Sequence, residues 1–328
     1  MQDIFVPESN PEDALASPLH TVTYVTADRE TVSRMLEEGY GLTPGEWIEA
    51  DADMRAYLGF DAVDAVSLCV FAKQGEGANV QVRVAHVPGD VPVVRPEYDG
   101  LYRGGATISA PMKDMAAHEK RMRDLGIDST IGVKVMDFTS PQGEVYTSGE
   151  IAYMAPENVF MLGVTRPDIF LPTGPVDEEL GIGGPSYSAR CIGNTDKVLD
   201  FFRTVLGYEI RRDLELTVGE RSALFMPEGT KERFIQAFAP GAATGYVVLM
   251  DHGALTKEPS APRLGPPFRG IAQWSFTTRD FDEIARRADA FGATILQPPG
   301  ERSSPGMPGR RTMVIEDPDG FPIEVSGD

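Results

Sequence analysis

The chain has 328 residues and a formal net charge of −20 at pH 7, and this length suits two domains of ordinary size. Apolar residues make up 41% and charged residues 24% of the sequence, a composition that is typical of globular domains and excludes wholesale disorder. A protein that binds nucleic acid needs a basic surface to contact the phosphate backbone, and this sequence is strongly acidic. We therefore expect no nucleic-acid partner.

Targeting and cofactor signals are also missing from the sequence. No apolar run approaches the length of a membrane span, and the first 20 residues carry acids and prolines instead of a basic and then apolar signal. We therefore expect a cytoplasmic protein with no membrane partner. Cys69 and Cys191 each lie in an apolar run and are predicted to be buried free thiols. No phosphate-binding glycine loop precedes a helix, which predicts no nucleotide cofactor.

The sequence contains four similar segments. Each has a short alternating strand, a polar residue, an amphipathic helix and a closing glycine. The polar residues are Asp28, Asp114, Asn194 and Asp280, which recur at intervals of 86, 80 and 86 residues. Asp and Asn are preferred N-caps, and glycine suits the left-handed position after a helix. The predicted strands are 20–25, 107–112, 186–191 and 273–278, and the predicted helices are 28–38, 114–125, 194–206 and 280–291.

Further strand-like runs follow each predicted helix. They alternate or are rich in β-branched residues, and turn residues separate them. Residues 1–16 are not part of the repeat and are predicted to be a flexible arm. The central Pro/Gly-rich connection divides the chain into domains 17–171 and 185–328 with a linker at 172–184. The predicted runs are 65–72, 80–87, 131–138, 143–152, 222–226, 234–239, 312–316 and 321–325.

Two motifs resemble the vicinal-oxygen-chelate family of glyoxalases, bleomycin-resistance proteins and extradiol dioxygenases. The turn from Asp317 to Gly320, which leads into a strand with Glu324, resembles the closing signature of these domains. Residues 195–208 are similar to the family's first helix and its exit. The resemblance extends from about residue 18 to residue 326. It implies an α+β fold, in which four βαβββ units form two glyoxalase-like domains with cupped mixed β-sheets.

The resemblance also implies where a metal ion would bind. In the family, ligands lie at the start of the first strand and on the last strand of a unit. Divalent ions prefer histidine nitrogen and carboxylate oxygen and accept a glutamine carbonyl. The first-strand positions are His20, Thr107, Ser186 and Gln273. The last-strand positions are Gln81 or Arg83, Thr147, Gln236 and Glu324.

The family pairs its units in two ways. If units one and two share one cup, and three and four the other, neither cup holds a working ligand set. If unit one closes with unit four, His20, Gln273 and Glu324 meet and form the hypothesised site for a divalent metal (Fe, Mn, Ni, Zn or Mg). Units two and three would then hold only the weak ligands Thr107, Thr147, Ser186 and Gln236.

A site without metal is the alternative. His20 and Glu324 would then be an acid–base pair, and Arg83 or Arg190 would stabilise an oxyanion. Tyr24 follows His20 on the same predicted strand and could donate a hydrogen bond. Glu324 could equally form a structural ion pair with Arg190. The predicted catalytic residues are therefore His20, Tyr24, Arg190 and Glu324.

The resemblance implies an enzyme that acts on a small aromatic or oxygenated substrate. A lyase, isomerase or dioxygenase would use the metal or the acid–base pair to stabilise an enolate-like intermediate. A non-catalytic binder of small molecules is the competing hypothesis, and an inactive scaffold or partner subunit is the third. A homo-oligomer is compatible with each of them. His118 is predicted to be exposed, and His252 to be an acid–base group at a pocket rim or a solvated loop residue.

Overall fold

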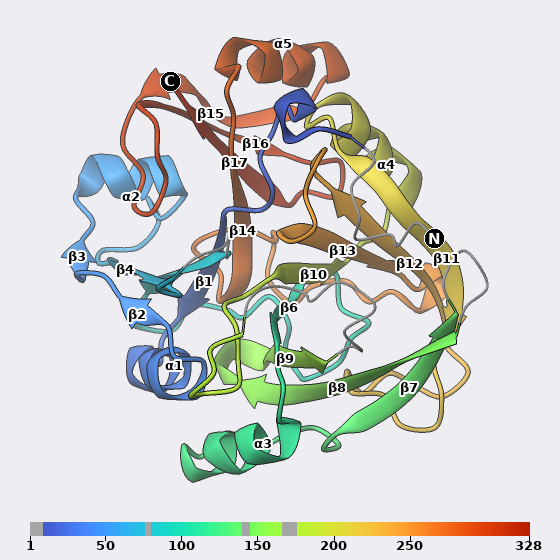
Figure 1. Cartoon of the computed structure of the whole chain (residues 1–328). Coiled ribbons are helices and arrows are strands. Elements are labelled where there is room, and N and C mark those ends of the chain that lie inside the picture. The colour runs from blue at the N-terminus through green and yellow to red at the C-terminus, as the bar shows by residue number, and fades with distance from the viewer. Residues whose placement is uncertain (1–8, 76–79, 140–144, 166–175) are drawn as a thin grey trace.

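The computed structural model describes residues 9–75, 80–139, 145–165 and 176–328 (Figure 1). It shows a mixed α+β fold with extensive curved sheet and few helices, as predicted. Within the described ranges no helix is long and apolar enough to cross a membrane.

The first two units carry their helices between the first strand and the later strands. Unit one consists of β1 (Thr21–Thr26), α1 (Arg29–Arg34) with the π-helical turn η2 (Met35–Gly39), β2 (Thr43–Pro44), β3 (Ile48–Glu49), α2 (Ala52–Leu58), β4 (Ser67–Ala72) and β5 (Gln81–His86). Unit two consists of β6 (Gly104–Pro111), α3 (Met115–Asp124), β7 (Lys134–Thr139), β8 (Val145–Ala155), the 3-10 turn η3 (Pro156–Asn158) and β9 (Val159–Thr165).

The third and fourth units repeat this order. Unit three consists of β10 (Tyr187–Cys191), α4 (Thr195–Thr204), β11 (Glu209–Thr217), β12 (Lys231–Phe238) and β13 (Tyr246–Asp251). Unit four consists of β14 (Gly270–Thr277), α5 (Phe281–Phe291), β15 (Thr294–Glu301), β16 (Arg311–Glu316) and β17 (Pro322–Gly327). The 3-10 turns η1 (Pro11–Asp13) and η4 (Gly253–Leu255) lie outside these strands and helices.

The predicted helix starts are confirmed. The side chains of Asp28, Asp114 and Asp280 each accept a hydrogen bond from a backbone N–H in the first turn. Asn194 holds the cap position without such a bond. Helix α2 was not predicted, although its signals are present: Asp51 caps it, and Gly59 ends it in the left-handed conformation at φ 82°.

Several strand predictions were wrong. Residues 222–226 form a loop, and the apolar strands β9 and β13 were missed together with β11 and β15. β9 and β13 pair in parallel with the first strand of their units, and strands buried on both faces lack the alternation that the prediction used. In consequence Thr147 and Gln236 lie on β8 and β12, not on the last strands of their units.

The units pair in the second of the two predicted ways. β1 runs antiparallel to β14, with Thr21 opposite Ser275, so unit one closes with unit four. β6 lies beside β10, where the backbone N–H of Ser186 donates to the carbonyl of Ser109 at 2.7 Å. Units two and three therefore face each other (Figure 1). Each cup combines one unit from each half of the chain.

His118 holds two units together. It was predicted to be exposed, which is wrong, since only 2% of the residue is accessible. It lies on the inner face of α3, 2.8 Å from the hydroxyl of Tyr153 and 3.0 Å from the carbonyl of Gly39. Burial lowers the pKa of His118 to about 4, so the ring is neutral at pH 7.

A glycine at the contact between β6 and β14 gives a test of this arrangement. Gly105 on β6 pairs with Ile271 on β14, and a Cβ at Gly105 would lie 2.4 Å from the Cβ of Ile271. We expect Gly105→Ala to lower the free energy of unfolding by about 1–3 kcal/mol through overpacking, measured by urea denaturation. Gly219→Ala is the control, because its added Cβ meets nothing within 4 Å. Equal stability of the two variants would contradict the close crossing.

Candidate functional site

Arg83 occupies the centre of the cup between units one and four. It lies on β5 beside Thr23, and its side chain is fully buried. Every nitrogen of its head group donates a hydrogen bond. Nε donates to Thr23 (3.1 Å), Nη1 to Ser304 (2.7 Å) and the carbonyl of Pro305 (3.2 Å), and Nη2 to Thr23 (2.8 Å), Gln273 (2.7 Å), Glu324 (2.9 Å) and Ser275 (3.4 Å).

Glu324 is the carboxylate partner of this arginine. Its Oε2 accepts from Arg83 and from the hydroxyl of Ser275 at 2.7 Å, and its Oε1 accepts from the hydroxyl of Tyr57 at 2.9 Å. Burial acts to raise the pKa of Glu324, but Arg83 and neighbouring hydroxyls outweigh it and hold the pKa below its usual value. The buried group is therefore an ion pair with both carboxylate oxygens engaged.

The structure brings together only some of the predicted site residues. His20 immediately precedes β1, with Nδ1 2.9 Å from the hydroxyl of Thr21. Burial lowers the pKa of His20, Glu324 opposes this shift and Arg83 adds to it. Tyr24 belongs to the hydrophobic core, and its hydroxyl donates to the carbonyl of Pro156. It has no hydrogen bond to Arg83 or Glu324.

Arg190 also lies apart from this group. It forms a buried ion pair with Asp317, and its guanidinium lies over the rings of Phe321 (4.7 Å) and Trp274 (5.4 Å). Glu324 was alternatively predicted to form a structural ion pair with Arg190. It does form an ion pair, but its partner is Arg83. The reason is register: Arg83 and Glu324 lie on strands that flank the β1–β14 pair.

With Arg83 in place, the residues of this cup do not fit a divalent cation. The guanidinium already contacts the Gln273 and Glu324 oxygens that would bind the metal, and a second cation beside it would be repelled. Within the described ranges no cluster of three His, Cys, Asp or Glu side chains could hold a metal ion. We therefore derive no metal-dependent step at His20, Gln273 and Glu324.

The other cup contains a cavity of about 540 Å³. One wall is a face of the sheet β10–β13–β12–β11. Along one row of this face Ala189, Val248, Gln236 and Arg212 are successive neighbours on the four strands. Thr107, Tyr146, Ser148, Glu150 and Leu162 of unit two line the opposite side, and the loop 222–226 contributes Leu224 and Met226.

Arg212 is a buried cation without an acidic partner. It is 8% exposed, its Nη2 donates to the hydroxyl of Tyr146 at 3.1 Å, and it forms no ion pair with any residue that the structure describes. Its Nε has no hydrogen-bond partner in the described part of the chain, and the same holds for the Oε1 of Gln236, which is 1% exposed. Buried polar groups without partners are costly, so a bound ligand would stabilise them.

Glu232 lines the other end of the cavity. It lies four residues from Gln236 on β12, about 13 Å along the strand. Its Oε2 is 3.0 Å from Nε2 of His252, whose Nδ1 is 3.4 Å from the sulfur of Cys191. His252 was predicted to lie at a pocket rim or in a solvated loop. Both predictions are wrong, because the residue is buried. Burial raises the pKa of Cys191 to about 12, which keeps the thiol protonated.

Arg212 and Glu232 were not predicted as site residues. Arg212, Leu214 and Leu216 alternate on β11, a strand that the sequence pattern did not reveal. Glu232 lies just before the predicted strand 234–239. The alternation along β11 was the signal that could have found Arg212.

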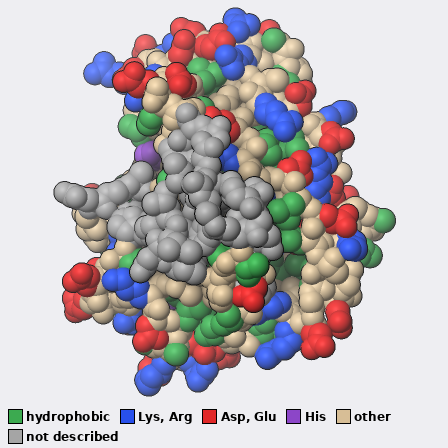
Figure 2. Space-filling model, turned by 45° about the vertical axis from the view of Figure 1, so that its right-hand side comes forward, with side chains coloured by type: hydrophobic (Ala, Val, Ile, Leu, Met, Phe, Trp, Pro, Cys, Tyr) green, Lys and Arg blue, Asp and Glu red, His purple; other side chains and the backbone are tan. Residues whose placement is uncertain are grey.

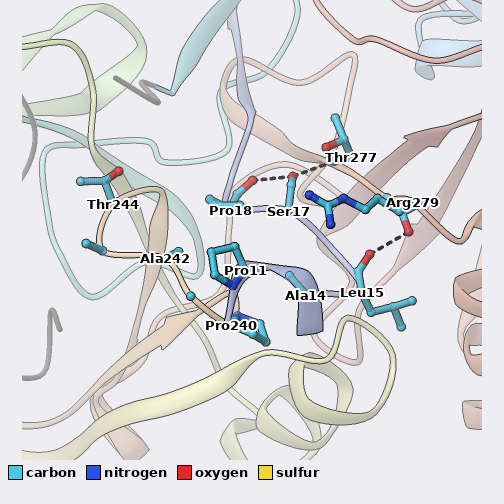
Figure 3. Close-up of a pocket in the computed structure, with 13 residues that line it drawn as sticks. Pro11, Ala14, Leu15, Ser17, Pro18, Pro240, Ala242, Thr244, Thr277 and Arg279 are labelled. Carbon is cyan, nitrogen blue, oxygen red and sulfur yellow. Dashed lines mark hydrogen bonds between the residues drawn. The ribbon is translucent and has the colours of Figure 1, made fainter. Parts of the chain in front are cut away.

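A second hollow of about 420 Å³ lies between the segment 11–18 and the ends of β12 and β14 (Figure 3). Prolines, alanines and hydroxyl residues form most of its lining, and Arg279 is a charged residue among them. The hydroxyl of Ser17 donates to the carbonyl of Pro18 (2.7 Å) and accepts from the N–H of Thr277 (2.9 Å). Its hydrogen bonds thus join chain segments to one another, so the 540 Å³ cavity is the better candidate site.

Comparison with known proteins places the C-terminal half of the chain in a family. Residues 186–325 match the model of the Glyoxalase/Bleomycin resistance protein/Dioxygenase superfamily. These residues belong to that superfamily. The search of curated proteins found no match.

Solved structures extend the likeness to the whole chain. Glyoxalase I from Zea mays is 14% identical, with a TM-score of 0.64 over 97% of this chain and 94% of that chain. A putative dioxygenase from Bacillus subtilis is also 14% identical, with a TM-score of 0.59 over 96% of this chain and 86% of that chain. These similarities show that the chain has the glyoxalase fold, and the fold alone does not determine a reaction.

The buried ion pair predicts how stability depends on pH. A depressed folded-state pKa means that Glu324 stabilises the fold above its unfolded pKa, near 4.5, and that this stabilisation is lost as the pH falls through the folded pKa. We expect Glu324→Gln to cost about 3–5 kcal/mol at pH 7, because Arg83 is left buried without a counter-charge. The difference from the unmodified protein should shrink in acid.

Urea denaturation at pH 7 and at pH values below 4.5 measures this difference. Asp124→Asn is the control, since Asp124 forms an exposed ion pair with Lys120 and should change stability by less than about 1 kcal/mol. If Glu324→Gln were no more costly than Asp124→Asn, the ion pair would not be a major contributor to stability.

Proposed function

We propose that this protein binds a small organic molecule with an anionic group in the cavity between units two and three. Arg212 would hold the anionic group. The observation that carries the proposal is the buried guanidinium of Arg212, which lines the cavity and forms no ion pair with a described residue. A carboxylate or phenolate would supply the missing counter-charge through charge-assisted hydrogen bonds.

The remaining walls favour a flat and largely apolar ligand. A volume of about 540 Å³ falls in the usual range for small-molecule sites. Phe234, Val248 and Met250 line one side, and Leu162 and Leu224 line the other. Tyr187 lines the cavity and stacks on Tyr246 with ring centroids 4.7 Å apart. An aromatic ring of a ligand could stack on these tyrosines in the same way. These features support the predicted aromatic or oxygenated class of ligand.

The binding site needs no metal. Arg83 occupies the cup in which the predicted ligands meet, so we base the proposal on the acid–base and binding alternatives. A cytoplasmic location, a homo-oligomer and the division into domains 17–171 and 185–328 remain predictions of the sequence.

An acid–base enzyme is the second candidate function, and the Glu232–His252 pair favours it. Glu232 would take a proton from a carbon next to a carbonyl group, and His252 would orient its carboxylate. The negative charge that develops on the substrate oxygen would be stabilised by a neighbouring donor of the cavity. A lyase or isomerase can begin in this way, and Cys191 would serve only as a buried neighbour of His252.

Matched ligands test the proposed binding site. We expect 1-naphthoate to raise the melting temperature more than its neutral analogue 1-naphthalenemethanol, because only the carboxylate pairs with Arg212. Arg212→Gln should weaken naphthoate binding roughly tenfold or more and leave the neutral analogue almost unchanged. Thermal shift and isothermal calorimetry give both affinities.

Arg123→Gln is the control for this experiment, because Arg123 is an exposed residue on α3. It should bind both ligands as the unmodified protein does. Equal affinities for the charged and neutral ligands in the unmodified protein would refute the role of Arg212.

Proton exchange separates the enzyme from the binder. Phenylpyruvate has an acidic C–H group beside a carbonyl. In deuterated water the protein should accelerate exchange of this hydrogen, followed by proton NMR, and Glu232→Gln should slow it by roughly 10²-fold or more. Cys191→Ser should exchange at the unmodified rate. Binding of phenylpyruvate without accelerated exchange would leave the binder as the function.

A further inference from the structure

We propose that the cup between units one and four is a cage of oxygen atoms built for a cation, and that the Arg83 guanidinium is its permanent occupant. Once the arginine side chain is removed, the same cage should bind a divalent metal ion such as Mn²⁺.

Oxygen atoms from several strands surround Nη2 of Arg83. Nη2 of Arg83 lies within hydrogen-bond reach of four side-chain oxygens, on β1, β14 and β17. Ser304 and the carbonyl of Pro305 bind Nη1 from the loop between β15 and β16. Six oxygen atoms therefore surround the two terminal nitrogens. The four around Nη2 belong to Thr23 (2.8 Å), Gln273 (2.7 Å), Glu324 (2.9 Å) and Ser275 (3.4 Å).

These oxygens suit a hard divalent cation. They are one carboxylate, an amide carbonyl, hydroxyls and a backbone carbonyl, which are the oxygen donors that Mg²⁺, Mn²⁺ and Ca²⁺ use in proteins. Glu324 supplies the negative charge. The donors would have to move inward, since metal–oxygen distances are roughly 2.0–2.6 Å. The donors can move inward only after the guanidinium is removed, because it fills the space between them.

The carboxylate is held in place without help from Arg83. Tyr57 on α2 donates to its Oε1 and Ser275 donates to its Oε2. Outer hydrogen bonds of this kind orient carboxylate ligands in metal sites. Removal of the arginine should therefore leave Glu324 pointing into the vacated space.

Arg83 fills the centre of the cup between units one and four, whereas the cup between units two and three contains the cavity of about 540 Å³. A cation attached to the chain is always present, and it joins the two units without a supply of metal. The cup of units one and four is then structural, and the cup of units two and three remains for a ligand.

The test is a metal titration of Arg83→Ala with MnCl₂, by isothermal calorimetry and thermal unfolding. We expect one Mn²⁺ per chain and a rise in melting temperature of roughly 5 °C at a metal concentration about one hundred times the dissociation constant. The unmodified protein and Arg83→Lys should show neither effect, because each retains a cation in the cage. Arg83→Ala combined with Glu324→Gln should lose the response.

Each outcome decides the proposal. If Arg83→Ala does not fold alone, recovery of its native circular dichroism on refolding with Mn²⁺ supports the cage. Failure to recover with Mn²⁺, Mg²⁺ or Ca²⁺, while Arg83→Lys folds, overturns it. A folded Arg83→Ala that binds none of these ions, or binds them equally well without the Glu324 carboxylate, also overturns it. None of these measurements uses the cavity of Arg212, so they are independent of the proposed function.

Discussion

A buried guanidinium must find an oxygen for each of its N–H groups, and in this protein the oxygens come from distant parts of the chain. Arg83 on β5 obtains them from β1, β14, β17 and the loop between β15 and β16. An unpaired charge in this position would cost several kcal/mol. The first and last units must therefore lie together, and the antiparallel pairing of β1 with β14 provides the geometry. Tyr57 extends the network to α2.

This pairing decides the character of the other cup. When unit one closes with unit four, units two and three face each other through β6 and β10. Charge is balanced within the first cup, where Arg83 meets Glu324, and is unbalanced around Arg212 in the second. A cup whose buried polar groups lack partners gains stability from a bound ligand, whereas a cup whose hydrogen bonds are complete does not.

The acidic surface and the proposed anionic ligand act at different ranges. Figure 2 shows acidic and basic side chains interspersed over one face of the molecule. The net charge of −20 would slow the approach of an anion. Exposed charges are screened over about 8 Å at physiological ionic strength, whereas Arg212 would contact the ligand directly inside the cavity. Local pairing therefore dominates affinity, and the surface charge acts mainly on the association rate.

The sequence by itself determined the four units, because capping residues and helical periodicity are local signals. Asp28, Asp114 and Asp280 cap their helices as predicted. The glyoxalase fold was predicted from the repeat together with the resemblance of the Asp317–Gly320 turn and residues 195–208 to the family. Apolar strands such as β13 were missed, since burial on both faces removes the alternation that reveals a strand. Arg212 was missed because the alternation along β11 was not recognised. Only the tertiary structure decided which units pair and whether Glu324 faces a metal or an arginine. That choice depends on strands more than two hundred residues apart, whose contacts leave no local pattern in the chain.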